Sequence, residues 1–183
     1  MNRTIGITSA SVLAAVSIIF QIVHIGYLTP WGMWIDLVAI PWILAYFIFG
    51  FRTSVLTACV SAVLIALLAP SGYIGASMKL LATIPMIIGP ALVLLFSRKK
   101  LKDFEKMRWL LIALALSLVI RGAFVLPVNY FIAIPLFFGM ETSQALAFIP
   151  PWLMFLLNAV QGVIDMTVAW TLAFRFKMTR FGK

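Results

Sequence analysis

The sequence predicts an all-α membrane protein, a six-transmembrane-helix bundle with both the N- and the C-terminus in the cytoplasm. The chain of 183 residues is 64% hydrophobic and 10% charged, and its mean hydropathy is +1.13. Because one spanning helix needs about 20 apolar residues, this length has room for roughly six spans joined by short loops. We expect a single integral membrane domain over residues 1–183, located in the cell membrane.

The distribution of positive charge sets the expected orientation. Twelve of the 14 Lys and Arg residues gather in four places, which are Arg3, Arg52, residues 98–108 and residues 175–183. Basic residues collect on the cytoplasmic side of a membrane because they are poorly translocated. Since both ends of the chain carry such residues, the chain is predicted to cross the membrane an even number of times.

Glycine and proline delimit the first three predicted spans. Residues 5–25 form an apolar stretch without a clear small-residue cleavage site, so they are predicted to be a span and not a signal peptide. This span ends at residues 26–32, where glycine, proline and interfacial aromatic residues begin. Residues 35–49 return to the inside, a tight turn follows at Gly50, and residues 54–68 climb outward again.

Glycine, proline and charged residues also delimit the last three predicted spans. Residues 69–75 are rich in proline and glycine and are predicted to form an outer loop. Residues 76–97 then descend, with two internal prolines that are expected to bend the helix. After the basic inner loop, residues 109–131 climb, and an outer connection leads to the final span at residues 152–176.

The composition also excludes some classes of function. A net charge of +9 would suggest nucleic-acid binding in a soluble protein. Here we attribute it to the inner loops, which face anionic lipid, and expect no nucleic-acid partner. The single cysteine, Cys59, and the single histidine, His24, offer no metal-ligand set, so no metal is expected.

Two charged residues are predicted to lie near the middle of the membrane. Counting about 1.5 Å per residue from the inner helix ends puts Arg121 and Asp165 at the same depth, roughly 16 to 18 Å above the inner boundary. A buried charge keeps its ionisation chiefly when it is paired. These residues are candidates for a buried ion pair, which could fasten two helices or contact a ligand.

A second polar match lies nearer the outer surface. The same count puts Asn129 and Asn158 at about 27 to 30 Å. Asn158, Gln161 and Asp165 also follow an i, i+3, i+7 spacing, so they form one polar stripe on an apolar helix. Amide groups both donate and accept hydrogen bonds, which suits a neutral ligand with polar edges. Interhelical hydrogen bonding is the alternative.

Two further charged residues and several aromatic residues lie toward the outside. Lys79 is predicted to snorkel toward the headgroups, although it could also bind a ligand. Asp36 could cap the second span or line the same cavity. The outer segments also supply aromatic rings that could stack on a ligand or form the ordinary interfacial belt. These rings are Tyr27, Trp31, Trp34, Tyr73, Tyr130 and Trp152.

The first predicted span carries small residues at a helical spacing. Ala10 and Ala14 are four residues apart, so one face is smooth enough for another helix to approach closely. Such a face could pack inside the bundle or dock a partner protein.

Together these features resemble a known family, the substrate-binding S components of energy-coupling factor (ECF) vitamin transporters, and most closely the riboflavin-specific members. The resemblance is carried by the Ala-x-x-x-Ala face and by four stretches that span most of the chain. These stretches are residues 34–41 (WIDLVAIP), 72–79 (GYIGASMK), 129–136 (NYFIAIPL) and 158–162 (NAVQG).

The resemblance implies a role and partners. An S component captures one micronutrient from outside, while a transmembrane T component and two cytoplasmic ATPases drive its release inside. The chain has no Gly-x-x-x-x-Gly-Lys-[Ser/Thr] motif and is not expected to supply the ATPase itself. By the resemblance, Ala10 and Ala14 contact the T component, and Asn129 and Asn158 bind the flavin ring system.

Two positions depart from the riboflavin pattern, and other functions stay open. Gln161 stands where a Lys is common, and Lys79 stands where an Asn is usual. The alternatives are an S component for a different vitamin or small heteroaromatic, a carrier that works without an ATPase, and an integral membrane enzyme. We expect no enzyme and no cofactor, because the acidic residues are scattered along the chain. They are Asp36, Asp103, Glu105, Glu141 and Asp165.

Overall fold

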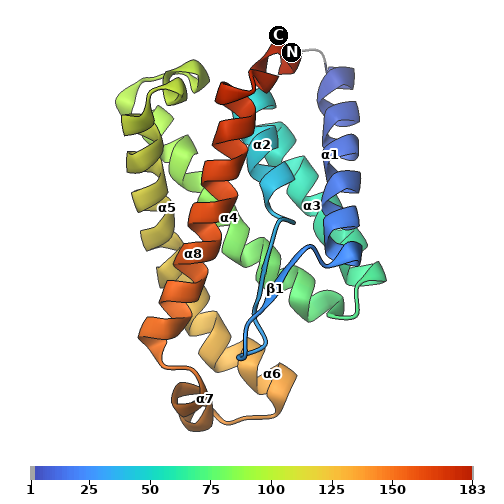
Figure 1. Cartoon of the computed structure of the whole chain (residues 1–183), viewed down its shortest axis with the longest axis vertical. Helices are drawn as coiled ribbons and strands as arrows, with labels where there is room; N and C mark the ends of the chain where they lie inside the picture. The colour runs from blue at the N-terminus through green and yellow to red at the C-terminus, as the bar shows by residue number, and fades with distance from the viewer. Residues whose placement is uncertain (1–2, 183) are drawn as a thin grey trace.

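A computed structural model describes residues 3–182, and Figure 1 shows an elongated bundle of helices. The α-helices are α1 (Arg3–Val23), α2 (Ile40–Phe49), α3 (Phe51–Leu68), α4 (Gly72–Ser97), α5 (Met107–Val128), α6 (Ile134–Phe138), α7 (Thr142–Phe148) and α8 (Pro151–Trp170). The strands β1 (Gly26–Leu28) and β2 (Trp34–Asp36) pair antiparallel. Two 3-10 helices, η1 (Leu101–Glu105) and η4 (Met178–Gly182), and two π-helical segments, η2 (Asn129–Ala133) and η3 (Thr171–Arg175), complete the order.

Within the described residues, five helices are long and apolar enough to cross a membrane. They confirm the predicted helical membrane bundle. The predicted second span is different, because α2 has only ten residues and reaches about 15 Å at the usual helical rise. The residues before it form the β1–β2 hairpin, and Pro41 stands in the first turn of α2, where proline is tolerated. The count of six spans therefore stays a prediction.

The fifth predicted span is longer than expected. Helix α5 continues through the π-helical segment η2 into α6, so the apolar run extends to Phe138 and not to residue 131. Proline inside a helix removes a backbone hydrogen bond, and a local π turn is one way to accommodate the break. Pro127 lies just before η2 and Pro135 just after it, so this part of the helix is irregular where it leads toward α7.

The core is centred on α2, which is buried on almost every side. Phe47 packs edge-on against Phe104 of η1 and Phe174 of η3, with ring centroids 5.6 Å apart in both cases. Ser17 of α1 ties α2 in place, because its hydroxyl donates to Val38 O at 2.6 Å and accepts from Trp42 Nε1 at 2.8 Å. The short helix is therefore an internal element surrounded by α1, α3, α8 and η4.

The small-residue face of α1 is used inside the molecule. Helix α1 packs on α3 and α2, and Ala10 and Ala14 are each only 1% exposed. Small side chains let the helix backbones approach closely, which explains why these positions face inward. The prediction that Ala10 and Ala14 form an accessible docking face is therefore wrong for this structure.

The chain begins and ends at the same end of the bundle (Figure 1). The turn between α2 and α3, the loop from α4 to α5 and the C-terminal segment η4 meet there, and η4 contacts the end of α2. The described basic residues predicted to share one side of the membrane thus lie at a common end, and Lys183 lies outside the described residues. That this side is the cytoplasm remains a prediction.

Candidate functional site

A cavity of about 370 Å³ lies in the half of the bundle away from the termini. Its walls come from the hairpin, the first half of α4, the run from α5 to α6, and the first half of α8. The main lining residues are Trp31, Gly32, Met33, Trp34, Asp36, Ser71, Met78, Lys79, Thr83, Arg121, Val125, Asn129, Ile134, Phe137, Phe138, Met154, Asn158, Gln161 and Asp165. This volume is within the range of small-molecule sites, about 300 to 1,000 Å³.

The hairpin places its connecting turn at the cavity. Thr29 N donates to Met33 O at 2.9 Å, and Thr29 Oγ1 accepts from Met33 N at 3.1 Å, so the turn is closed on itself. Gly32 has a φ of +77°, which favours glycine. The turn carries Trp31 and Met33 to the cavity wall, and β2 adds Trp34. A short strand pair thus supplies two of the rings that line the site.

An ion pair joins the hairpin to α4. The ammonium of Lys79 donates to Asp36 Oδ2, and the two side chains are 20% and 8% exposed. The other carboxylate oxygen of Asp36 accepts from Val38 N at 3.0 Å. The prediction that Lys79 snorkels to the headgroups is wrong here, because its ammonium group points into the bundle and pairs with the carboxylate of Asp36. Asp36 lies in β2 and does not cap α2, whose N-cap residue is Ala39.

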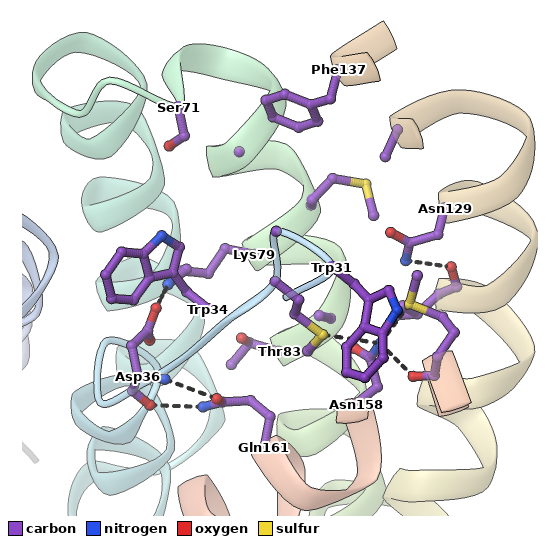
Figure 2. A pocket seen from close by; sticks show the side chains of 18 of the residues that line it. Trp31, Trp34, Asp36, Ser71, Lys79, Thr83, Asn129, Phe137, Asn158 and Gln161 are labelled. Carbon is purple, nitrogen blue, oxygen red and sulfur yellow. Dashed lines mark hydrogen bonds and ion pairs between the residues drawn. The ribbon is translucent and has the colours of Figure 1, made fainter. Parts of the chain in front are cut away.

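Gln161 fastens the same strand to α8. Its amide nitrogen donates to Asp36 O at 2.8 Å and to Asp165 Oδ1 at 2.7 Å, while its oxygen accepts from Asp36 N at 3.0 Å. Figure 2 shows Asp36 held between Lys79 and Gln161. Gln161 therefore pairs with a strand backbone 125 residues away in sequence, and its amide is engaged by the protein.

The floor of the cavity is a buried polar group around Arg121. Its guanidinium donates to Asn158 Oδ1 through Nε at 3.3 Å and through Nη2 at 3.1 Å. Its third nitrogen, Nη1, is 4.0 Å from Asp165 Oδ2. The exposed fractions of Arg121 and Asp165 are 3% and 0%. The two charges lie at a common depth as the residue count predicts, and Arg121 also reaches one step outward to Asn158.

Asn129 keeps part of its amide free for a ligand. Its nitrogen donates to Val125 O at 2.8 Å, and its oxygen points into the cavity (Figure 2). The depth count places Asn129 level with Asn158. The structure pairs Asn158 with Arg121 and with Met154 O instead.

Tyr130 is not at the cavity wall, so its predicted place in the site is wrong. Its ring is 5% exposed and packs with Ile134 and Ile149, and its hydroxyl donates to Ile149 O at 2.6 Å. A π-helical turn at η2 changes which side chains face inward, and this turns Tyr130 toward the connection between α7 and α8.

The outer aromatic residues divide into two groups. Trp31 and Trp34 line the cavity, and His24 lies against Trp34 with ring centroids 5.1 Å apart. Tyr27, Tyr73 and Trp152 are instead 62%, 74% and 67% exposed. The list of candidate rings thus contains two that face the cavity and three that suit the interfacial belt.

The cavity is balanced in charge. Asp36 pairs with Lys79, and Asp165 lies beside Arg121, so two carboxylates face two cations. A site that holds no net charge favours a ligand that is itself neutral, because an ionic ligand would have to break one of these pairs. No group of three possible metal ligands occurs within residues 3–182.

Sequence reasoning missed several lining residues. Thr83, Met78 and Met154 line the cavity, although each looks like an ordinary residue of an apolar helix. For Thr83 a usable signal exists, since it follows Lys79 by four residues and so shares its helix face. The methionines carry no such signal, because a thioether packs in any apolar environment.

Comparison with known proteins supports the architecture. The sequence matches no protein-family model and no curated protein. The structure is similar to a solved structure of the S component of a bacterial ECF transporter, with a TM-score of 0.74 and 19% identity over 100% of both chains. At this identity the likeness concerns the fold. The fold and the apolar helices are those of a multi-pass membrane protein.

Proposed function

We propose that the chain is the substrate-binding S component of an ECF-type importer and that its ligand is riboflavin taken up from outside the cell. The observation that carries the proposal is the charge-balanced cavity of about 370 Å³ with indole rings in its wall. The shared fold of a bacterial S component supports the transport class. The riboflavin assignment rests on the sequence resemblance and on the chemistry of the site.

Riboflavin matches the cavity in three respects. Its ring system is flat and apolar on both faces, which suits Trp31 and Trp34. Its pyrimidine edge carries an N–H donor, which suits the free oxygen of Asn129. It has no net charge, so the two charge pairs can stay intact while it binds.

The absorption spectrum of the protein purified from cells tests the ligand. We expect a co-purifying yellow flavin, or a colourless protein that gains the flavin spectrum when riboflavin is added. A colourless protein that ignores added riboflavin would contradict the riboflavin assignment, while leaving the S-component proposal to the partner test below.

A matched pair of variants tests the site. Asn129→Ala removes the free acceptor and should weaken riboflavin binding about fivefold, the effect of one ordinary hydrogen bond. Tyr73→Phe is the control, because Tyr73 is 74% exposed and does not line the cavity. Equal affinity of both variants would exclude Asn129 from the site. Asn158 is a poorer test residue, since its loss also leaves Arg121 with fewer partners.

The proposal includes partners, namely a transmembrane T component and two cytoplasmic ATPases. Uptake of labelled riboflavin should need all of them together with ATP. Accumulation in vesicles that contain this chain alone would instead support a self-sufficient carrier. The fold likeness is to a transporter subunit and not to an enzyme.

A different vitamin or small heteroaromatic is the alternative ligand. One observation favours it. Lys79 and Gln161 depart from the residue types of the riboflavin pattern, and both side chains bind Asp36. Competition against bound riboflavin by other neutral heteroaromatic vitamins distinguishes the two. A competitor that binds more tightly than riboflavin would identify the physiological ligand.

A further inference from the structure

A second hollow lies at the opposite end of the bundle, close to the chain termini. It is an open groove of about 360 Å³ between the α2–α3 turn, the last part of α4 and η1. Its walls include Tyr46, Phe51, Leu94, Leu95 and Leu101. Leu94 and Leu95 precede Arg98 by three to four residues, which is about 5 Å along the helix axis. The groove is therefore apolar, and its α4 residues lie one helical turn before Arg98.

The groove is held in shape by packing. Gly50 joins α2 to α3 with a φ of +91°, and a Cβ added there would lie 3.7 Å from Leu101 Cδ1, so η1 rests on this turn. Phe104 of η1 is fully buried, and its carbonyl accepts from Trp170 Nε1 at 2.7 Å. The basic loop is thus fastened to the end of α8, and the groove is a fixed feature.

Unpaired cations flank this groove in the chain. Arg52 follows Phe51, while Arg98, Lys100 and Lys102 surround Leu101, and all four are exposed. Both ion pairs found among residues 3–182 lie in the other cavity. Two acids, Asp103 and Glu105, lie in η1, and Asp103 accepts from the Lys100 backbone N–H at 2.9 Å. Three exposed cations that form no ion pair among the described residues, Arg52, Arg98 and Lys100, therefore neighbour the apolar groove in the chain.

The hydroxyl of Tyr46 also lacks a hydrogen-bond partner among the described residues. Tyr46 is 2% exposed, and it lines the groove. Among the hydrogen bonds of the described residues, none involves its hydroxyl. A buried tyrosine hydroxyl usually finds a partner. The groove thus offers one free donor beside its apolar wall.

We propose that this groove binds an anionic phospholipid of the adjacent membrane leaflet. One acyl chain lies on Phe51, Leu94 and Leu95, the phosphate faces Arg52, Arg98 and Lys100, and the Tyr46 hydroxyl donates to an oxygen of the lipid. Apolar and cationic groups in this order match the order of chain, glycerol and phosphate in a membrane lipid. A free phosphate would match the cations alone and leave the apolar wall exposed.

Native mass spectrometry of the purified chain with added phosphatidylglycerol or phosphatidylcholine of identical acyl chains tests the proposal. Phosphatidylglycerol should bind more tightly. The double variant Arg98→Gln/Lys100→Gln should lose this preference by about fivefold for each cation removed. Tyr46→Phe should weaken binding by about fivefold, the effect of one hydrogen bond.

The matched control is Lys99→Gln/Arg108→Gln. It removes the same charge from the same loop, but both side chains lie over the ring of Trp109, at 5.8 and 5.1 Å from its centroid, which is not a groove residue. The control should keep the preference for phosphatidylglycerol. An equal loss in both double variants, equal binding of the two lipids, or full competition by glycerol phosphate would each overturn the proposal.

Discussion

The two ends of the bundle differ in where they keep their charges. At the cavity end, Asp36, Lys79, Arg121 and Asp165 lie inside the molecule, in pairs. At the end that holds the termini, the interior is apolar and is built around Phe47, while the cations are exposed.

This difference indicates which end of the bundle is structural and which end binds a ligand. Aromatic packing holds the terminal end together, and the buried charged side chains among the described residues all line the cavity at the other end. Buried ion pairs are weak evidence for stability, because desolvation offsets much of their attraction. Charged groups within membrane-spanning segments are instead usually functional. The polar interior at one end therefore supports a ligand role for that end, and the apolar interior at the other supports a structural one.

The largest expected effect comes from removing one partner of a buried pair. Arg121→Met leaves Asp165 without its cation and should destabilise the protein by about 3 to 5 kcal/mol. Thermal unfolding in detergent measures the change. The double variant Arg121→Met/Asp165→Leu should recover much of the loss, since no uncompensated charge remains. If the double variant were as unstable as the single one, charge pairing would not explain the arrangement at this end.

A second test adds volume to the apolar interior, at the buried face of α1. Ala10→Trp inserts a large ring where Ala10 is 1% exposed and should cost about 1 to 3 kcal/mol or more through overpacking. Ala15→Trp is the control, because Ala15 is exposed on the other face of α1. The two variants are compared by thermal unfolding. Equal stability would show that α1 packs through a different face.

A smaller effect is expected at the basic loop. Trp170→Phe removes the hydrogen bond to Phe104 O and should cost about 1 to 2 kcal/mol, because a buried carbonyl loses its donor. Amide hydrogen exchange in residues 98–108 should become faster. Ligand affinity should stay the same, since Trp170 does not line the cavity. A changed affinity would mean that the two ends are coupled.

The smallest effect is a pH dependence in the same loop. The backbone N–H of Lys100, aided by the charges of Lys99, Lys102 and Lys106, holds the pKa of Asp103 below its usual value of 3.8. A carboxyl with a lowered pKa stabilises the fold above its unfolded pKa, and this contribution is lost as the pH falls through the folded value. Below pH 3.8, the protection factors of the loop amides, which correct for the slower intrinsic exchange at acid pH, should decrease. Asp103→Asn should already show lower protection factors at neutral pH and no such decrease.

The helices could be predicted because apolar length and basic loops are strong signals, but local geometry could not. Residues 35–39 are predicted as the start of the second span, but the structure has β2 at Trp34–Asp36 and begins α2 only at Ile40. An apolar stretch this short does not distinguish a helix from a strand. The facing direction of α1 was ambiguous as well, because small residues occur on both of its sides, at Ala10 and Ala14 and at Ser11 and Ala15.

The site could be located in part. Depth counting brings Arg121 and Asp165 together because both helices are regular there. It also places Asn129 and Asn158 at a similar depth, and both line the cavity, but it does not reveal that Arg121 donates to Asn158. Gln161 could be recognised as polar and inward, but its partner is a backbone 125 residues away, which no local pattern in the sequence reveals.

Calorimetric titration of the purified protein with riboflavin tests the central claim, that the charge-balanced cavity binds a neutral flat ligand. We predict saturable binding at one site per chain, weakened in Trp34→Ala and unchanged in the control Tyr27→Ala, whose ring is 62% exposed. Absence of saturable binding by riboflavin and by other neutral heteroaromatic vitamins, or equal affinity of the two variants, would contradict it.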